Sequence, residues 1–529
     1  MSRPSRRAGT LALVRTELRL DRIRIALWVG GITLMVVVSA QSVADLFPTQ
    51  ADLDRAAESS ENPAIIAFQG PVQALDTLGG QVAFQIGAFG LVIVALMALL
   101  TTGRMTRAEE EAGRLELVRS LPVGRNAPIL AAAAIGVAMS VVVGGCVAVA
   151  LIALDLPVAG SLNFGLGYTA VALVFTGFTL VAAQVTENHR LANGLAGCVL
   201  GAAFVLRAIG DMNDGLLSWF SPIGWAQKAR PFADERWWPL LLAGAVAVGL
   251  AALATWLQGI RDLGGGLVPP RPGPAAASRR LAGSFALAAR LLRGSLVGWT
   301  AGTAFLALVY GSVTSAIEDF VADNPDLADF LVQTGGDLTD SYLATAARTT
   351  ALIGSGFAIS AMLRIRSEEA NDRSEPVLAT PVSRQRYWSG YLAVSVFGSV
   401  IVLGVAGFVL GVSAAIAVDD ASLVWSGTVA MLNYLPAVLV LIGVAAALVG
   451  RFPGATGLAW VALGIGFVVA MFGPLLGLPD WVLRVSPFQN VALVPAEGVA
   501  PAPLFALVAL GVVLLVAGLA TYRRRDIPS

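Results

Sequence analysis

The chain has 529 residues, of which 56% are hydrophobic and only 13% charged, and its mean hydropathy is +0.76. This composition excludes a soluble globular domain and predicts an integral membrane protein. The two cysteines lie in apolar runs and His189 is the only histidine, which argues against a structural disulfide, a zinc site or any other metal site. The formal net charge of zero neither favours nor opposes a nucleic-acid partner, and none is predicted.

The N-terminal sequence MSRPSRRAGT precedes an apolar span without a small-residue cleavage site, which indicates a retained cytoplasmic segment. Residues 9–24 are amphipathic at helical spacing, with Leu11, Val14 and Leu18 on one side and arginines on another. We expect this segment to lie flat at the cytoplasmic interface as an anchor, or to contact a cytoplasmic partner.

Apolar runs long enough to cross a bilayer predict an all-α membrane protein of about twelve transmembrane helices. The predicted spans begin near Ile25, Val82, Pro128, Asn163, Leu191, Trp238, Ser295, Ala344, Trp388, Val424, Ala455 and Pro503. Pro436 is expected to kink the tenth span.

Arg and Lys residues gather in alternate loops: the N-terminal tail, residues 104–125, 261–293 and 364–386, and the C-terminal tail. The positive-inside rule therefore places both termini and these loops in the cytoplasm. The opposite loop 318–330 is acidic. It lacks the glycine and ligand alternation of an EF-hand, so a solvated acidic helix is preferred over a calcium site.

A densely charged segment occurs twice. RAEEEAGRLELVRSLPVGR (residues 107–125, the first charged block) aligns without gaps with RSEEANDRSEPVLATPVSR (residues 366–384, the second charged block). Each follows the second span of its half. The repeat predicts two pseudosymmetric six-span halves in parallel orientation: residues 1–260, with the N-terminal interfacial helix, and residues 281–529, joined by a Gly/Pro-rich cytoplasmic linker at 261–280.

Each block is expected to be helical, supported by the i,i+4 pairs Glu110–Arg114 and Glu369–Arg373 and ended by Pro122 or Pro381. A solvated loop that only sets topology would explain the arginines but not the repeated glutamates, because acids contribute little to the positive-inside rule. A docking surface for a cytoplasmic partner explains both. Pro376 has no counterpart in the first block and is expected to break or kink the helix near Glu375, which makes the two docking sites unequal.

The two blocks, together with WFSPIGWAQKARPFADERWWPLLL (219–242), resemble permeases of the type-2 ABC exporter superfamily, in its actinobacterial antibiotic-exporter (tetronasin-type) branch. The twelve-span layout extends the resemblance over essentially the whole chain. It implies a plasma-membrane permease that moves an amphipathic small molecule, such as an antibiotic or drug, out of the cell.

The same resemblance implies that each block forms a coupling helix seated on a separate ATPase subunit, with two copies per chain and with ATP and Mg on that subunit. The residues carried over are Glu109, Glu110, Arg114, Glu116, Glu368, Glu369, Arg373 and Glu375. The sequence agrees that the chain itself is not an ATPase. A phosphate-binding loop needs a lysine, and the only lysine, Lys228, lies in an outer loop.

Polar residues within spans need partners, and either another helix or the substrate could supply them. The candidates for a substrate path are Gln85, Gln184 and Asn433. Four tryptophans near the outer boundary form either an ordinary aromatic belt or an outer gate: Trp219, Trp225, Trp237 and Trp238. Arg207 and Arg348 are expected to snorkel to the outer interface.

The main alternative function is a proton-coupled secondary drug transporter of twelve spans. It is weakened because no membrane-buried acid stands out as a proton relay. A membrane enzyme is weaker still, because the acidic pair in DMND (211–214) lacks histidine or cysteine company.

Overall fold

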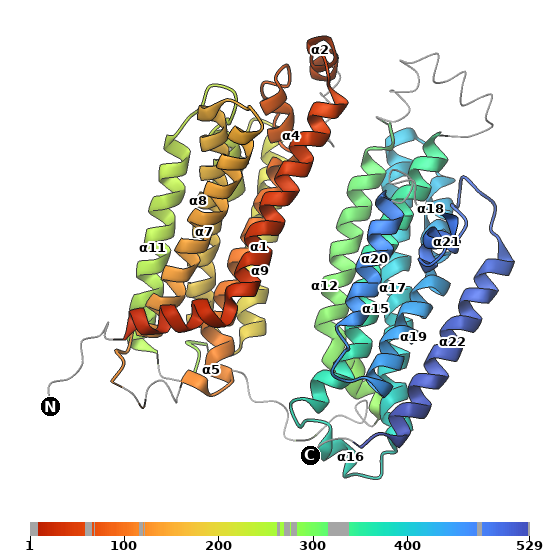
Figure 1. Ribbon diagram of the computed structural model, residues 1–529. Helices are drawn as coiled ribbons and strands as arrows, with labels where there is room; N and C mark the ends of the chain where they lie inside the picture. Colours follow the sequence, from red (N-terminus) through yellow and green to blue (C-terminus); the bar gives the residue numbers. More distant parts are fainter. Residues whose placement is uncertain are drawn as a thin grey trace. The chain divides into compact units, whose positions relative to one another are not determined.

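A computed structural model describes residues 9–58, 66–67, 69–115, 120, 122–261, 265–268, 276, 283–315, 338–472 and 479–526 (Figure 1). The described residues form helices and loops without strands, and the chain divides into two compact units, Met1–Gly273 and Pro274–Ser529. The division falls inside the segment 261–280.

The first unit contains six long apolar helices and several short ones. The long helices are α1 (Thr10–Leu46), α4 (Leu78–Gly103), α7 (Ala127–Ala153), α8 (Val158–Val185), α9 (His189–Asp211) and α11 (Trp238–Ile260). The short ones are α2 (Gln50–Glu58), η1 (Arg104–Ala108), α5 (Glu109–Glu111), η2 (Leu217–Phe220) and α10 (Pro222–Lys228).

The second unit is built in the same way. Its long helices are α12 (Ser284–Ser312), α15 (Leu338–Glu369), α17 (Arg384–Val418), α19 (Leu435–Arg451), which follows α18 (Leu423–Leu432), and α22 (Pro501–Arg524). The shorter ones are α16 (Glu375–Leu378), α20 (Leu458–Phe472), α21 (Asp480–Leu483) and η4 (Pro487–Asn490). Among the described residues, eleven helices are long and apolar enough to cross a membrane, and Leu458–Ala470 is a shorter apolar helix. The prediction of an all-α membrane protein with about twelve spans is confirmed.

Each unit packs around a central helix that its neighbours cover. In α8 and α15 most of the apolar window is buried, whereas α11 and α22 expose most of theirs. Leu241 and Val248 of α11 and Phe505 of α22 are more than 70% exposed, as expected for side chains that face lipid. Close packing in lipid relies on small residues. A Cβ atom on Gly144 of α7 would lie 2.3 Å from the Gly165 carbonyl oxygen of α8.

Two predicted irregularities appear where expected. The first turns of α1 run across the lower end of their unit before the helix turns upward along the bundle (Figure 1). The tenth span is interrupted between Leu432 and Leu435, with Pro436 in the first turn of α19. A proline is tolerated there because that N–H has no helical partner, and the break confirms the predicted kink.

Candidate functional site

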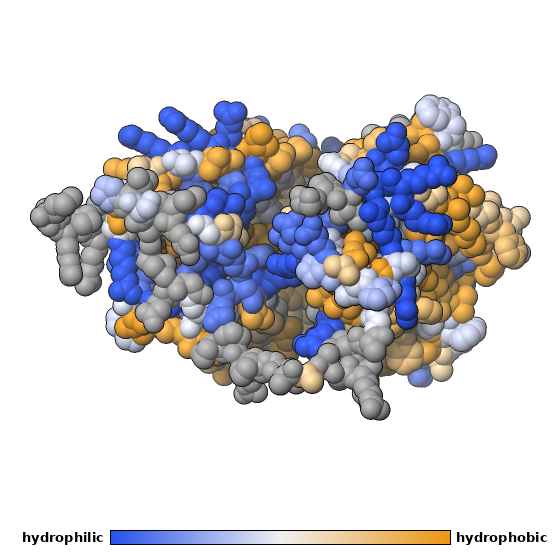
Figure 2. Space-filling model, turned by 90° about the horizontal axis from the view of Figure 1, so that it is seen from below, coloured by the Kyte–Doolittle hydropathy of each residue, from blue (hydrophilic) through white to orange (hydrophobic). Residues whose placement is uncertain are grey.

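The two charged blocks lie at the lower ends of their units, called the block ends below. Hydrophilic side chains gather on this face of each unit, with hydrophobic side chains toward the margins (Figure 2). In the first unit, α4 continues through a π-helical turn, η1, into α5, so that one helix carries the chain from the bundle into the block. In the second unit, α15 reaches Glu369 as a regular α-helix.

Glu110 of the first block is an internal residue. Its Oε2 atom accepts from Arg107 at 3.0 Å and from Arg261 at 3.1 Å, and its side chain is only 10% exposed. Arg107 is itself buried and donates through Nε to the Ala183 carbonyl oxygen at 2.5 Å. Because Ala183 belongs to α8 and Arg261 ends α11, Glu110 joins the block to the ends of two other spans.

Glu369 of the second block occupies the same kind of place. Both of its carboxylate oxygens accept from Arg525 Nη2 at 2.6 Å, and Arg366 lies 3.7 Å away. Its side chain is 1% exposed. The neighbouring Glu368 is also buried and pairs with Arg364 at 2.5 Å. Glu110, Glu368 and Glu369 are therefore held inside their own units.

Glu109 and Arg114 form an ion pair at the surface of the first block. Arg114 donates through Nε and Nη2 to the two carboxylate oxygens of Glu109 at 2.6 and 2.7 Å, and its side chain is 59% exposed. This contact raises the pKa of Arg114, so the guanidinium stays charged. The predicted pairing of Arg114 with Glu110 is wrong. The helix ends at Glu111, and the turn that follows places Arg114 beside Glu109.

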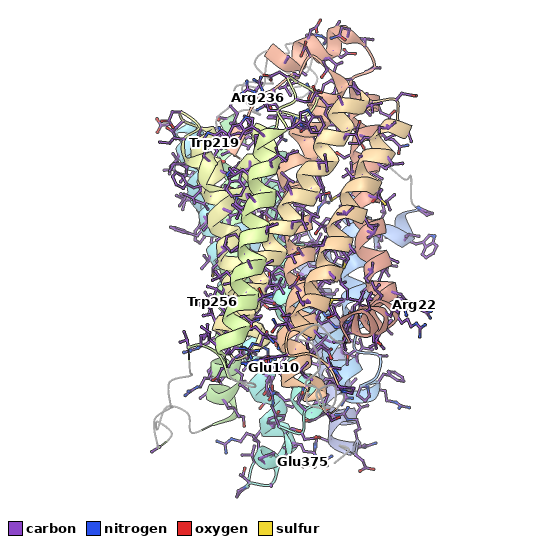
Figure 3. The ribbon with its side chains drawn as sticks, turned by 90° about the vertical axis from the view of Figure 1, so that its left-hand side faces the viewer. Arg22, Glu110, Trp219, Arg236, Trp256 and Glu375 are labelled. Carbon is purple, nitrogen blue, oxygen red and sulfur yellow. The ribbon has the colours of Figure 1, made fainter. Side chains whose placement is uncertain are left out.

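The second block exposes its later charges. Arg373 and Glu375 are both solvent-exposed, and Figure 3 shows Glu375 projecting from the end of its unit. The predicted Glu369–Arg373 pair is not made, because Glu369 faces Arg525 instead. Glu116, the equivalent of Glu375, lies outside the described residues.

The first block is not one continuous helix, contrary to the prediction, because α5 ends at Glu111. The second block is interrupted just before Glu375, as expected, but not by Pro376. In the second block, α15 ends at Glu369 and α16 begins at Glu375. Pro376 lies in the first turn of α16, so it helps to start a helix rather than breaking one. The break itself lies four residues before Pro376, where Asp372 adopts a positive φ.

Glu111 provides a further link that the sequence did not reveal. Its carboxylate accepts from the backbone N–H of His189 at 2.5 Å and lies 2.8 Å from the His189 ring Nδ1. His189 is the first residue of α9, and an acid there satisfies an unpaired helix N–H group and interacts favourably with the helix dipole. The second block has Ala370 at this position, so the repeat comparison gave no signal for it.

The proposed substrate-path residues do not form one site. Gln85 is exposed near the start of α4, whereas Gln184 is buried at the opposite end of the same unit, in the last turn of α8. Gln184 donates to the Leu180 carbonyl oxygen at 3.2 Å and helps to line a small cavity of about 30 Å³ beside Arg107 and Glu110. Asn433 belongs to the second unit.

Asn433 lies at the break between α18 and α19. Its side-chain amide donates to the Ala492 carbonyl oxygen at 3.1 Å, so it holds an irregular segment in place. For Gln184 and Asn433 the structure thus supplies protein partners, and a substrate contact by these residues stays a prediction.

Trp219 lies at the end of the first unit opposite the block (Figure 3), and Trp225 and Trp238 both contact it. The Trp219 and Trp238 rings stack with centroids 4.9 Å apart, and Trp225 Nε1 donates to the Trp219 carbonyl oxygen at 2.6 Å. The ammonium group of Lys228 lies 5.0 Å from the Trp219 ring centroid. Trp237 is 42% exposed. A role as an outer gate stays a prediction.

The two intramembrane arginines differ. Arg207 is fully buried and pairs with Asp211 at 3.5 Å, while Ser218 Oγ donates to Asp211 at 2.6 Å. The snorkelling prediction is therefore wrong for Arg207, because an internal acid compensates its charge. Arg348 is half-buried and donates to the Gln489 side-chain oxygen at 3.3 Å. The acidic loop 318–330 lies outside the described residues.

Bundles of long apolar helices with exposed apolar surfaces define this chain as a multi-pass membrane protein. The family model described as "Multidrug efflux system permease Rv1217c, C-terminal domain" matches residues 9–257 and 281–523. The chain is also 38% identical over 527 residues to the multidrug efflux system permease protein Rv1217c of Mycobacterium tuberculosis (strain ATCC 25618 / H37Rv), covering 98% of this chain and 95% of that protein. The chain belongs to the Rv1217c-like multidrug efflux permease family.

Proposed function

We propose that this chain is the transmembrane subunit of an ATP-driven exporter that moves amphipathic drugs or antibiotics out of the cell. Family membership supports drug efflux, since the similar mycobacterial protein carries that description. The sequence lacks the lysine-containing phosphate-binding loop that ATP hydrolysis within the chain would need, so the ATPase is a separate polypeptide.

The observation that carries the ATP-driven proposal is the division of each charged block into a buried and an exposed part. Glu110 and Glu369 are tied to other spans of their own unit, whereas Arg114, Arg373 and Glu375 project from the block ends. The exposed charges can contact a cytoplasmic subunit, and the buried acids would pass its movement to the spans. Glu109 holds the exposed Arg114 in this surface through their ion pair, whereas Glu368 pairs with Arg364 inside the unit.

The proposal is tested by co-purification in mild detergent, with mass spectrometry for a protein that carries ATP-binding motifs. We expect an ATPase to accompany the wild-type chain and to be lost from a variant with Arg114→Glu, Arg373→Glu and Glu375→Arg. These residues are exposed, so the changes should leave the fold intact. The matched control is Arg236→Glu, which alters an exposed charge at the opposite end of the first unit (Figure 3).

Absence of an ATPase from the wild-type sample, together with efflux that a protonophore abolishes, would instead support the proton-coupled transporter. Retention of the ATPase by the triple variant would show that the docking surface lies outside the charged blocks. The two results are distinct, because the first concerns the energy source and the second its point of contact.

A further inference from the structure

The arginine that follows the last long helix of each unit makes equivalent contacts with the charged block in both units. Arg261 follows α11 and Arg525 follows α22. The guanidinium of Arg261 binds Glu110 at 3.1 Å, and that of Arg525 binds Glu369 at 2.6 Å. Each therefore reaches back from the end of its span to the equivalent acid of the charged block.

A second arginine secures the backbone of the first in each unit. Arg125 donates to the Arg261 carbonyl oxygen at 2.9 Å, and Arg384 donates to the Arg525 carbonyl oxygen at 2.6 Å. Arg125 and Arg384 are equivalent residues at the ends of the two blocks, beside the helices α7 and α17. The block is thus bonded at both of its ends to the end of the last long helix of its unit.

A third contact extends the arrangement to another span. Arg107 donates through Nε to the carbonyl oxygen of Ala183, near the end of α8. Its equivalent, Arg366, donates through Nε to the carbonyl oxygen of Pro453, two residues after α19. The same atom makes the corresponding bond in each unit.

Repetition of the sequence alone does not account for this geometry. Arg107 aligns with Arg366, but the same alignment places Arg261 opposite Ala520, five residues short of Arg525. The two halves of the chain therefore reach this arginine over different lengths. A buried ion pair is a weak source of stability compared with apolar packing, so its presence in both units points to a role in relative positioning.

We propose that Arg261 and Arg525 are positioning residues that make the sixth span of each half move together with its charged block. This inference rests on the proposed function, in which an ATPase acts on the blocks. Breaking the contact leaves the exposed docking charges in place but releases the sixth span from them. Hydrolysis then continues while less of it is converted into transport.

Arg525 offers the cleaner test, because it lies close to the C-terminus and has matched neighbours. Arg523 and Arg524 carry the same charge in the same tail, are exposed, and make no ion pair within the described part of the chain. We expect Arg525→Gln to lower the drug transported per ATP hydrolysed about tenfold, with the ATPase still bound. Arg524→Gln should leave this ratio unchanged. The exchange Glu369→Arg with Arg525→Glu should restore part of the ratio.

Hydrogen–deuterium exchange provides a readout that needs no ATPase. Arg525→Gln should speed exchange in residues 366–384 and at the end of α22, and Arg524→Gln should not. Equal behaviour of the two variants would overturn the inference. So would a parallel loss of transport, ATPase activity and thermal stability, which would assign Arg525 a structural role only. If no ATPase accompanies the wild-type chain, the proposed energy source is wrong. The exchange result still tests the contact between Arg525 and the block, because it does not depend on an ATPase.

Discussion

Gly113 and Asp372 occupy equivalent positions in the two charged blocks, and both have a left-handed backbone, with φ of +71° and +55°. The turn that follows the second span is therefore the same in both units, although the residue type changed. Glycine adopts this conformation without strain, and aspartate tolerates it better than most residues do. The turn directs the chain away from the helix axis and leaves the block at the end of the bundle.

Gly113→Ala should lower the free energy of unfolding by about 1 kcal/mol, the cost of a left-handed conformation for a residue with a Cβ. No atom lies within 4 Å of the position that the added Cβ would take, so the effect is conformational rather than steric. Thermal unfolding in detergent measures it. Gly454→Ala is the control, since that glycine is equally open and has no left-handed φ. Equal midpoints for the two variants would show that the turn is not strained.

Glu111→Ala should destabilise the start of α9 by roughly 1 kcal/mol, because the backbone N–H of His189 loses its acceptor. The pair is partly exposed, which keeps the effect small. Hydrogen exchange of residues 189–192 reports it directly. Glu375→Ala removes an exposed glutamate from the other block and should leave this segment unaffected. Unchanged protection in Glu111→Ala would mean that Asn188, which also caps α9, is sufficient.

Removal of the charge should destabilise the protein strongly at Arg207 and only slightly at Arg348. Arg207→Gln leaves Asp211 buried without its cation and should cost about 3–5 kcal/mol, whereas the double change Arg207→Met with Asp211→Leu should cost less. Arg348→Gln removes a charge whose hydrogen-bond partner is the neutral Gln489, and stability should change little. Unfolding midpoints of the four proteins in one detergent decide this. Similar losses in Arg207→Gln and Arg348→Gln would contradict it.

The orientation predicted from the arginine distribution can be tested with single cysteines in a background lacking Cys146 and Cys198. A cysteine replacing Arg236 should react with a membrane-impermeant thiol reagent in intact cells. One replacing Glu375 should react only after permeabilisation, because the arginine distribution predicts that the block ends face the cytoplasm. Both positions are exposed, and the two variants differ only in the residue that is replaced. The reverse labelling pattern would show that the topology is the opposite of the predicted one.

Features set by local sequence were predictable, and those set by distant contacts were not. Apolar length marked the spans, and Pro436 marked the break between α18 and α19, because backbone chemistry acts on neighbouring residues. The predicted i,i+4 pairs within the blocks are not formed, because Glu110 and Glu369 pair with other arginines of their own units instead. Arg261 lies 151 residues from Glu110, and Arg525 lies 156 residues from Glu369. Only the fold brings such residues together.

The repeat comparison contained part of this information. Arg107, Arg125 and their equivalents Arg366 and Arg384 are identical across the two blocks, which could have marked them as functional. Glu110 and Glu369 each lie three residues after one of these arginines, a spacing at which an acid and a base can pair along a helix. Glu111 had no such signal, because its helix-capping contact occurs in one unit only.

The central claim is that ATP hydrolysis on a separate subunit drives drug export through this chain. Inverted membrane vesicles from cells that produce the chain together with its co-purifying ATPase provide the most direct measurement. With ATP, and with a protonophore present, the vesicles should accumulate a fluorescent drug, and vanadate or the Arg114, Arg373 and Glu375 variant should abolish the accumulation. Accumulation that a pH gradient alone drives, and that the protonophore abolishes despite ATP, would contradict the account.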